Sequence, residues 1–113
     1  MKELDPEMVQ KRLEAGEIML VDVREPHEFS EARIEGAFNY PLSTFSPEAL
    51  PVDGKRDIVL HCGTGKRSGM ALDRCCDDKI DGVAHMAGGL TAWRAAGLPV
   101  VAVDPSTGQL KRQ

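Results

Sequence analysis

Short apolar runs alternate with helix-forming segments along this chain. The runs are each short enough for a strand buried on both faces, and they lie at residues 18–21, 38–42, 57–61, 82–86 and 100–103. Helices are predicted from Asp5-Pro6 to Gly16 and over residues 26–33, 67–79 and 90–96, with one or two helical turns within residues 43–50. Strands that alternate with helices indicate an α/β domain with a largely parallel sheet.

Length, composition and charge narrow the class of protein. At 113 residues, the chain is long enough for one domain with its own core. Apolar residues make up 42% of it but aromatic residues only 4%, so aliphatic side chains must fill the interior. The formal net charge is −4 and the basic residues form no stripe, which argues against nucleic acid or an anionic membrane as a partner.

The cysteines and the first residues of the chain predict the cellular compartment of the protein. The three cysteines follow no zinc-ligand spacing, so no metal site is predicted. Acidic residues Glu3 and Asp5 stand where a signal peptide would be apolar, and no apolar run has membrane-spanning length. We therefore expect a protein of a reducing compartment, the cytoplasm. We expect the domain over residues 1–103 and a loose polar tail over residues 104–113.

The candidate chemistry is concentrated in residues 62–68, which we call the Cys62 loop. Cys62 ends the apolar run 57–61, and ligands of parallel sheets bind at such carboxyl ends. The predicted substrate-binding residues follow it directly, at Gly63, Thr64, Gly65, Lys66, Arg67 and Ser68. Glycines let the backbone turn its amides inward, and a helix N-terminus favours an anion. Such surroundings lower the pKa of a thiol and favour the nucleophilic thiolate of Cys62.

Three segments, in this order, resemble the rhodanese domain of sulfurtransferases. They are Val21-Asp22-Val23-Arg24-Glu25 continuing to Asn39-Tyr40-Pro41-Leu42, then the Cys62 loop, then Gly88-Gly89-Leu90 with Trp93 and Gly97-Leu98-Pro99-Val100. Together they cover residues 4–103, a length that fits one copy of the family's domain. The resemblance implies a central, mostly parallel five-stranded sheet with helices on both faces. It also implies that Cys62 accepts sulfane sulfur as a persulfide and passes it to a thiophilic acceptor, without a cofactor.

Loop length separates two chemistries that occur on this fold. Related phosphatases use a Cys-x5-Arg loop, whereas Arg67 follows Cys62 after four residues and Ser68 stands where the longer loop has its arginine. The shorter loop favours a sulfur atom on Cys62 over a phosphoryl group, so a phosphatase or arsenate reductase is the weaker alternative. We predict a thiosulfate sulfurtransferase with ping-pong kinetics, from which cyanide or a thiol removes the sulfur.

The residues around the loop allow more than one role. Lys66 and Arg67 are predicted to attract an anionic donor, which favours thiosulfate over 3-mercaptopyruvate, although Arg67 alone also suits a structural ion pair. The resemblance implies that Asp22 and Arg24 brace the loops, with Arg24 pairing an acid such as Glu28.

Three other side chains are given structural roles or none. Helical spacing places Cys75 in the core. His61 is expected to pack under the loop, because adjacent strand residues point to opposite faces. His85 has no partner that can be predicted from the sequence.

Two rival functions use the same fold. A persulfide relay that delivers sulfur to a protein partner would use the same Cys62 and every other site residue, so the sequence does not separate it from a free enzyme. A non-catalytic binding or sensing module would not need Cys62, and the presence of this cysteine disfavours it.

Overall fold

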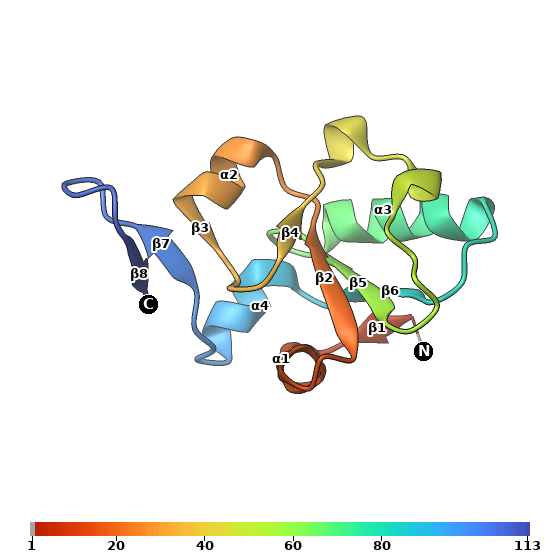
Figure 1. Cartoon of the computed structure of the whole chain (residues 1–113), viewed down its shortest axis with the longest axis horizontal. Coiled ribbons are helices and arrows are strands. Elements are labelled where there is room, and N and C mark those ends of the chain that lie inside the picture. The colour runs from red at the N-terminus through yellow and green to blue at the C-terminus, as the bar shows by residue number, and fades with distance from the viewer. Residues whose placement is uncertain (1) are drawn as a thin grey trace.

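A five-stranded parallel sheet forms the centre of the structure, in the order β1-β6-β5-β2-β4 (Figure 1). The structure is a computed structural model that describes residues 2–113. The strands are β1 (Glu3–Leu4), β2 (Ile18–Asp22), β4 (Phe38–Asn39), β5 (Asp57–His61) and β6 (Val83–Met86). The central strands β2 and β5 are nearly or wholly buried, as their apolar sequences require. This architecture confirms the predicted fold class.

Helices cover both faces of this sheet, as predicted. They are α1 (Pro6–Glu14), α2 (Pro26–Glu31), α3 (Lys66–Asp77) and α4 (Gly89–Ala95), with 3-10 turns η1 (Leu42–Thr44) and η2 (Pro47–Ala49). One apolar cluster lies between the sheet and α3 with the two 3-10 turns, and it includes Cys75. The other lies between the sheet and helices α1 and α4, where Trp93 is only 2% exposed. Both residues therefore pack in the core, as predicted.

Local signals set the ends of the first helix. Asp5 caps α1 by accepting the Met8 N–H at 2.8 Å, and Pro6 occupies the first turn, where no partner for its missing N–H is needed. Gly16 follows the helix with a φ of +72°, a conformation that glycine adopts without strain.

A second, antiparallel sheet corrects two predictions about the chain. It joins β3 (Ala32–Arg33), β7 (Val101–Val103) and β8 (Leu110–Arg112). The second helix therefore ends at Glu31, before the predicted end at residue 33, because residues 32–33 pair with β7. The run 100–103 contains the predicted strand, which joins the antiparallel sheet, and the fifth strand of the parallel sheet is β1, which was not predicted.

Residues 104–113 form half of a β-hairpin, so the prediction of a loose tail is wrong. Figure 1 shows β7 and β8 projecting beyond the central sheet, with the C-terminus at this end of the molecule. Asp104 stabilises the turn, since its carboxylate accepts the Ser106 N–H at 2.9 Å and lies 2.9 Å from the Lys111 ammonium. Backbone pairing with β7 orders strand β8, although the side chains of β8 are all exposed.

No helix within residues 2–113 is long and apolar enough to cross a membrane.

Candidate active site

The Cys62 loop connects the carboxyl end of β5 to the N-terminus of α3, as predicted. Strand β5 ends at His61, and α3 begins at Lys66, four residues after Cys62. Gly65 stands before the helix with a φ of +100°, which only glycine adopts readily. A Cβ at this position would also lie 3.2 Å from the Gly88 nitrogen. Residue 65 is thus glycine for two independent reasons.

The sulfur of Cys62 is held by hydrogen-bond donors of its own loop. The backbone N–H of Gly65 lies 3.1 Å from Sγ, and that of Ser68 lies 3.3 Å from it. The Ser68 hydroxyl lies 3.6 Å from the same sulfur. Cys62 and Ser68 are both buried, whereas Thr64 and Lys66 are exposed at the mouth of the loop.

These donors control the ionisation of Cys62. Burial alone raises the pKa of the thiol, because it penalises the thiolate. The backbone and hydroxyl donors of Ser68, followed by the N–H groups of Gly65 and Thr64, outweigh burial and lower the pKa below its usual value. The site therefore favours a thiolate at the point where the sequence predicts a nucleophile.

The turn before α4 holds the other side of the Cys62 loop. Leu90 donates its N–H to the Cys62 carbonyl at 2.8 Å, and Thr91 donates to the Gly63 carbonyl at 3.0 Å. Gly89 has a φ of +60°, and a Cβ there would clash with the Cys62 carbonyl oxygen. This role of Gly89 was not predicted from the sequence, because the contact joins segments that are distant along the chain.

Replacing Gly89 by alanine should therefore destabilise the domain. The new Cβ clashes with backbone and sits at an unfavourable φ, and we expect the free energy of unfolding to fall by about 1–3 kcal/mol. Urea denaturation would measure the loss. Gly97→Ala is the matched control, because Gly97 has a φ of +77° and a Cβ added there would have no atom within 4 Å. Equal losses in the two variants would contradict a role for the contact with Cys62.

Arg67 is engaged in a bidentate ion pair with Glu28 of α2. Its guanidinium nitrogens lie 2.6 and 3.0 Å from the two carboxylate oxygens. The predicted pairing of Glu28 with Arg24 is wrong, since Arg24 points to Asp22 instead. Arg67 thus forms the structural ion pair that was one of its two possible roles in the sequence analysis. This ion pair links the start of α3 to α2.

The contribution of the Glu28–Arg67 ion pair to the stability of the fold depends on pH. The hydrogen bonds from Arg67 lower the pKa of Glu28 to about 2, below its ordinary value of 4.5. A carboxylate with a lowered pKa stabilises the fold above pH 4.5 and loses this contribution as the pH falls toward 2.

We therefore expect Glu28→Gln to cost about 0.2–1 kcal/mol at neutral pH, since the pair is partly exposed, and nothing near pH 2. Unfolding curves recorded across this range would show the difference closing. Glu31→Gln, an exposed residue at the end of the same helix, controls for the loss of one negative charge. A difference between wild type and Glu28→Gln that persists unchanged at about pH 2 would contradict the assignment.

Asp22, Arg24 and His61 form a buried polar cluster beneath the site. Arg24 donates from Nε and Nη2 to the Asp22 carboxylate at distances of 2.8–3.1 Å, and also from Nη2 to the Ala32 carbonyl at 2.6 Å. His61 Nε2 lies 3.5 Å from Asp22 but forms no hydrogen bond within the described residues. Burial lowers the pKa of His61 and favours its neutral form. His61 therefore packs beneath the loop, as predicted.

One residue near the sulfur was not predicted from the sequence. His85, on β6, places Nδ1 3.1 Å from the Ser68 hydroxyl oxygen. No signal in the sequence pairs these residues, because strand β6 and helix α3 meet only in the folded chain.

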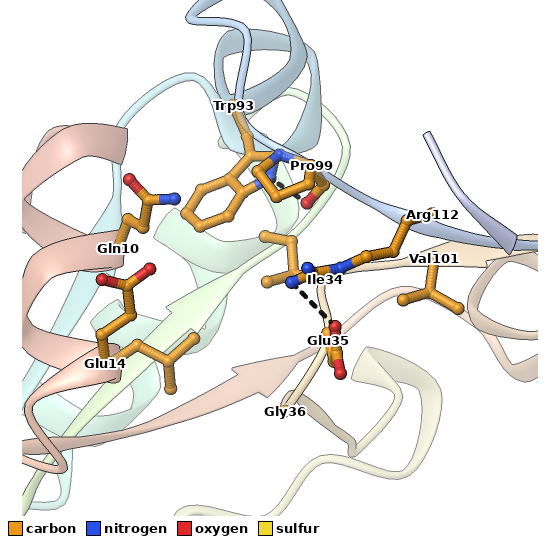
Figure 2. A pocket seen from close by; sticks show the side chains of 10 residues that line it. Gln10, Glu14, Ile34, Glu35, Gly36, Trp93, Pro99, Val101 and Arg112 are labelled. Carbon is orange, nitrogen blue, oxygen red and sulfur yellow. Dashed lines mark hydrogen bonds and ion pairs between the residues drawn. The ribbon is translucent and has the colours of Figure 1, made fainter.

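A separate cavity of about 290 Å³ lies away from the Cys62 loop, between α1, α4 and the C-terminal hairpin (Figure 2). Two of its polar groups are already paired: Arg112 lies 3.0 Å from Glu35, and the Trp93 indole N–H donates to the Pro99 carbonyl at 2.9 Å. Within residues 2–113, no group of three His, Cys, Asp or Glu side chains could hold a metal ion. The Cys62 loop is therefore separate from this cavity, and the described residues around it include no metal-binding group.

One family model and two named relatives match most of this chain. The model of the Rhodanese-like domain matches residues 5–96. A protein of Allochromatium vinosum called "Sulfurtransferase" is 31% identical, with 90% of this chain and 96% of that protein covered. "Thiosulfate sulfurtransferase GlpE" of Shewanella oneidensis is 30% identical over 84% of this chain and 94% of that protein.

Two further comparisons concern length and fold. An uncharacterised protein of Synechocystis is 38% identical over 96% of this chain, which spans only 60% of that protein's length. The solution structure of the Rhodanese-like domain of Anabaena Alr3790 superposes with a TM-score of 0.80, at 24% identity, with 95% of this chain and 83% of that chain covered. This last likeness concerns the fold alone.

Proposed function

The chain belongs to the rhodanese-like domain family, and we propose that, like the Allochromatium and Shewanella proteins named as sulfurtransferases, it transfers sulfane sulfur, through a persulfide on Cys62. The observation that carries the proposal is the pair of backbone N–H donors, from Gly65 and Ser68, that point at the Cys62 sulfur, with the Ser68 hydroxyl oxygen 3.6 Å from it. Donors held in place by a folded loop stabilise an anion at little cost in reorganisation. They suit a thiolate and equally a persulfide anion.

The reaction proceeds in two steps. The Cys62 thiolate attacks the outer sulfur of thiosulfate, the sulfur–sulfur bond of the donor breaks, and sulfite leaves with the bonding electron pair. Cyanide or a thiolate then attacks the outer sulfur of the persulfide, which returns Cys62 to a thiolate. This covalent sequence is ping-pong.

We assign different roles to the two cations of the loop. Arg67 is held by Glu28 and keeps the loop in place, whereas the ammonium of the exposed Lys66 draws the anionic donor to the mouth of the loop. The name of the Shewanella relative supports thiosulfate as the donor, with a thiol or a protein as the acceptor in the cell. The three free cysteines suit a reducing compartment, for which we propose the cytoplasm.

Thiosulfate:cyanide sulfurtransferase activity tests the proposal. Thiocyanate production should accompany an increase of one sulfur atom in the intact mass after thiosulfate treatment, and cyanide should reverse that increase. Cys76→Ser is the matched control, because Cys76 is exposed and would otherwise be a second acceptor of sulfur. This variant should keep both signals.

The other outcomes separate the rival functions. A mass increase without turnover would support a persulfide relay that requires a protein acceptor. The absence of both signals would contradict sulfur transfer from thiosulfate. Hydrolysis of a generic aryl phosphate that depends on Cys62 would instead support a phosphatase.

A further inference from the structure

His85 links the buried Cys62 loop to the edge of the parallel sheet. It lies on β6 in register with Glu3 of the neighbouring strand β1. Its Nε2 is 3.2 Å from a Glu3 carboxylate oxygen, and its Nδ1 is 3.1 Å from the Ser68 hydroxyl oxygen. The side chain of His85 is 14% exposed and that of Glu3 is 63% exposed, so this end of the arrangement meets solvent.

Ser68 completes a continuous path from the nucleophile to the surface. Its hydroxyl oxygen lies 3.6 Å from the Cys62 sulfur and 3.1 Å from His85. Ser68 is fully buried, so water does not compete for its hydroxyl. The path therefore runs from the Cys62 thiol through Ser68 and His85 to Glu3.

The order of donors and acceptors along this path is suited to moving a proton outward. A carboxylate only accepts hydrogen bonds, so Glu3 favours a proton on the Nε2 of His85. The Nδ1 lone pair is then free to accept from the Ser68 hydroxyl at 3.1 Å, and the other acceptor within reach of this hydroxyl is the Gly65 carbonyl oxygen at 3.3 Å. The Ser68 oxygen in turn has a lone pair that accepts from the Cys62 thiol.

We propose that His85 accepts the proton of Cys62 through the Ser68 hydroxyl, with Glu3 orienting the imidazole. The thiol proton passes to the Ser68 oxygen while the hydroxyl proton of Ser68 passes to Nδ1, which leaves a thiolate and an imidazolium. While it keeps the proton, the imidazolium is the positive partner of the thiolate and makes it more stable. At higher pH the proton leaves to solvent at the Glu3 side. His85 is a positioning residue, since it acts on Cys62 only through Ser68, and its role rests on the proposed use of Cys62 as a nucleophile.

The other groups around His85 do not offer the proton a different destination. Helix α3 contributes Ser68 and the backbone at Gly69, and β5 contributes the apolar Leu60 in register with His85. Lys2 accepts the backbone N–H of His85 through its carbonyl, but its ammonium is 3.1 Å from the Cys76 sulfur. His61, the histidine adjacent to Cys62, lies beside Asp22 and is fully buried.

The pH dependence of Cys62 alkylation by iodoacetamide tests this role without any sulfur donor. Mass spectrometry of the tryptic peptide 57–66 reports on Cys62 alone, because Cys75 and Cys76 lie in another peptide. In His85→Gln, glutamine still accepts from Ser68 but takes no proton. We expect the alkylation profile to move up by about one pH unit, which makes alkylation about tenfold slower near pH 6 and equal to wild type at high pH.

Further variants separate a proton path from a merely structural contact. Glu3→Gln should move the profile in the same direction by a smaller amount, and His27→Gln, an exposed histidine of α2, should overlay wild type. Ser68→Ala should shift the profile at least as far, and adding His85→Gln to it should shift it no further.

Two results would overturn the inference. One is a His85→Gln profile that matches wild type, and the other is a loss of rate that is uniform at every pH, as loop distortion would produce. Turnover with thiosulfate should follow the same pH pattern. If wild type shows neither turnover nor a gain of one sulfur atom, sulfur transfer from thiosulfate is contradicted, and the alkylation profiles still decide the role of His85.

Discussion

Replacing Cys62 by serine is expected to abolish both the gain of one sulfur atom and thiocyanate production. A serine hydroxyl ionises far above the physiological pH range and its oxygen forms no persulfide. Loss of a covalent nucleophile lowers the rate on the order of 10³-fold or more, and no other residue is expected to accept the sulfur in place of Cys62. Serine is close to cysteine in size and can accept from the same N–H groups of Gly65 and Ser68, so the fold should persist.

The other cysteines provide the controls for this variant. Cys75 is buried, which raises the pKa of its thiol to about 11 and leaves little thiolate near neutral pH. Cys76 is exposed, so its replacement removes the remaining accessible thiol. The gain of one sulfur atom after thiosulfate treatment and the release of thiocyanate should be the same in Cys76→Ser as in wild type. Sulfur that remains bound to Cys62→Ser would place the acceptor elsewhere and would contradict the proposed mechanism.

Replacing Arg24 by methionine is expected to give the largest loss of stability. Arg24 is 6% exposed and Asp22 is 0% exposed. The guanidinium donates from Nε and Nη2 to the two carboxylate oxygens of Asp22. Methionine fills similar space but leaves a buried carboxylate without its partner. Breaking a buried ion pair in this way costs about 3–5 kcal/mol, a large part of the roughly 5–15 kcal/mol that stabilises a domain.

Urea denaturation would measure this loss, and a double variant would identify its cause. In Asp22→Asn/Arg24→Met the unpaired charge is gone, so much of the stability should return. Protein that remains folded should keep an alkylatable Cys62, because Arg24 bonds to Asp22 and the Ala32 carbonyl, whereas the N–H donors to the sulfur come from Gly65 and Ser68. A stability of Arg24→Met within about 1 kcal/mol of wild type would show that the pair is not needed.

Much of the architecture follows from patterns that are local in the sequence. Five apolar runs predicted strands, and each run contains one. The central strands β2 and β5 are apolar because they are buried on both faces, whereas β4 and β7 are partly exposed. Asp5-Pro6 and Gly16 predicted the limits of the first helix for similarly local reasons. The position of Cys62 between a buried strand and a helix also predicted a thiol surrounded by inward-facing amides, and the structure has this arrangement.

The partners of individual side chains, by contrast, did not follow from the sequence. Glu28 pairs with Arg67 and not with Arg24, because Arg24 lies within reach of Asp22 on its own strand end. Residues 110–112 look like solvated tail in the sequence, yet they pair with β7. His85 gained two partners, Glu3 and Ser68, that no spacing along the chain connects.

The amino-acid sequence by itself determined the four helices, five of the strands and the place of Cys62 at the end of a buried strand, but not the short strands β1, β3 and β8. Hydrophobic periodicity, helix caps and glycine turns act over a few residues, so they can be interpreted without knowledge of the fold. Only the tertiary structure decided that β1 lies beside β6, and hence that Glu3, His85 and Ser68 meet near Cys62. The reason is that sheet order and ion pairing depend on distances between segments far apart in the chain, which are set only when the whole core packs.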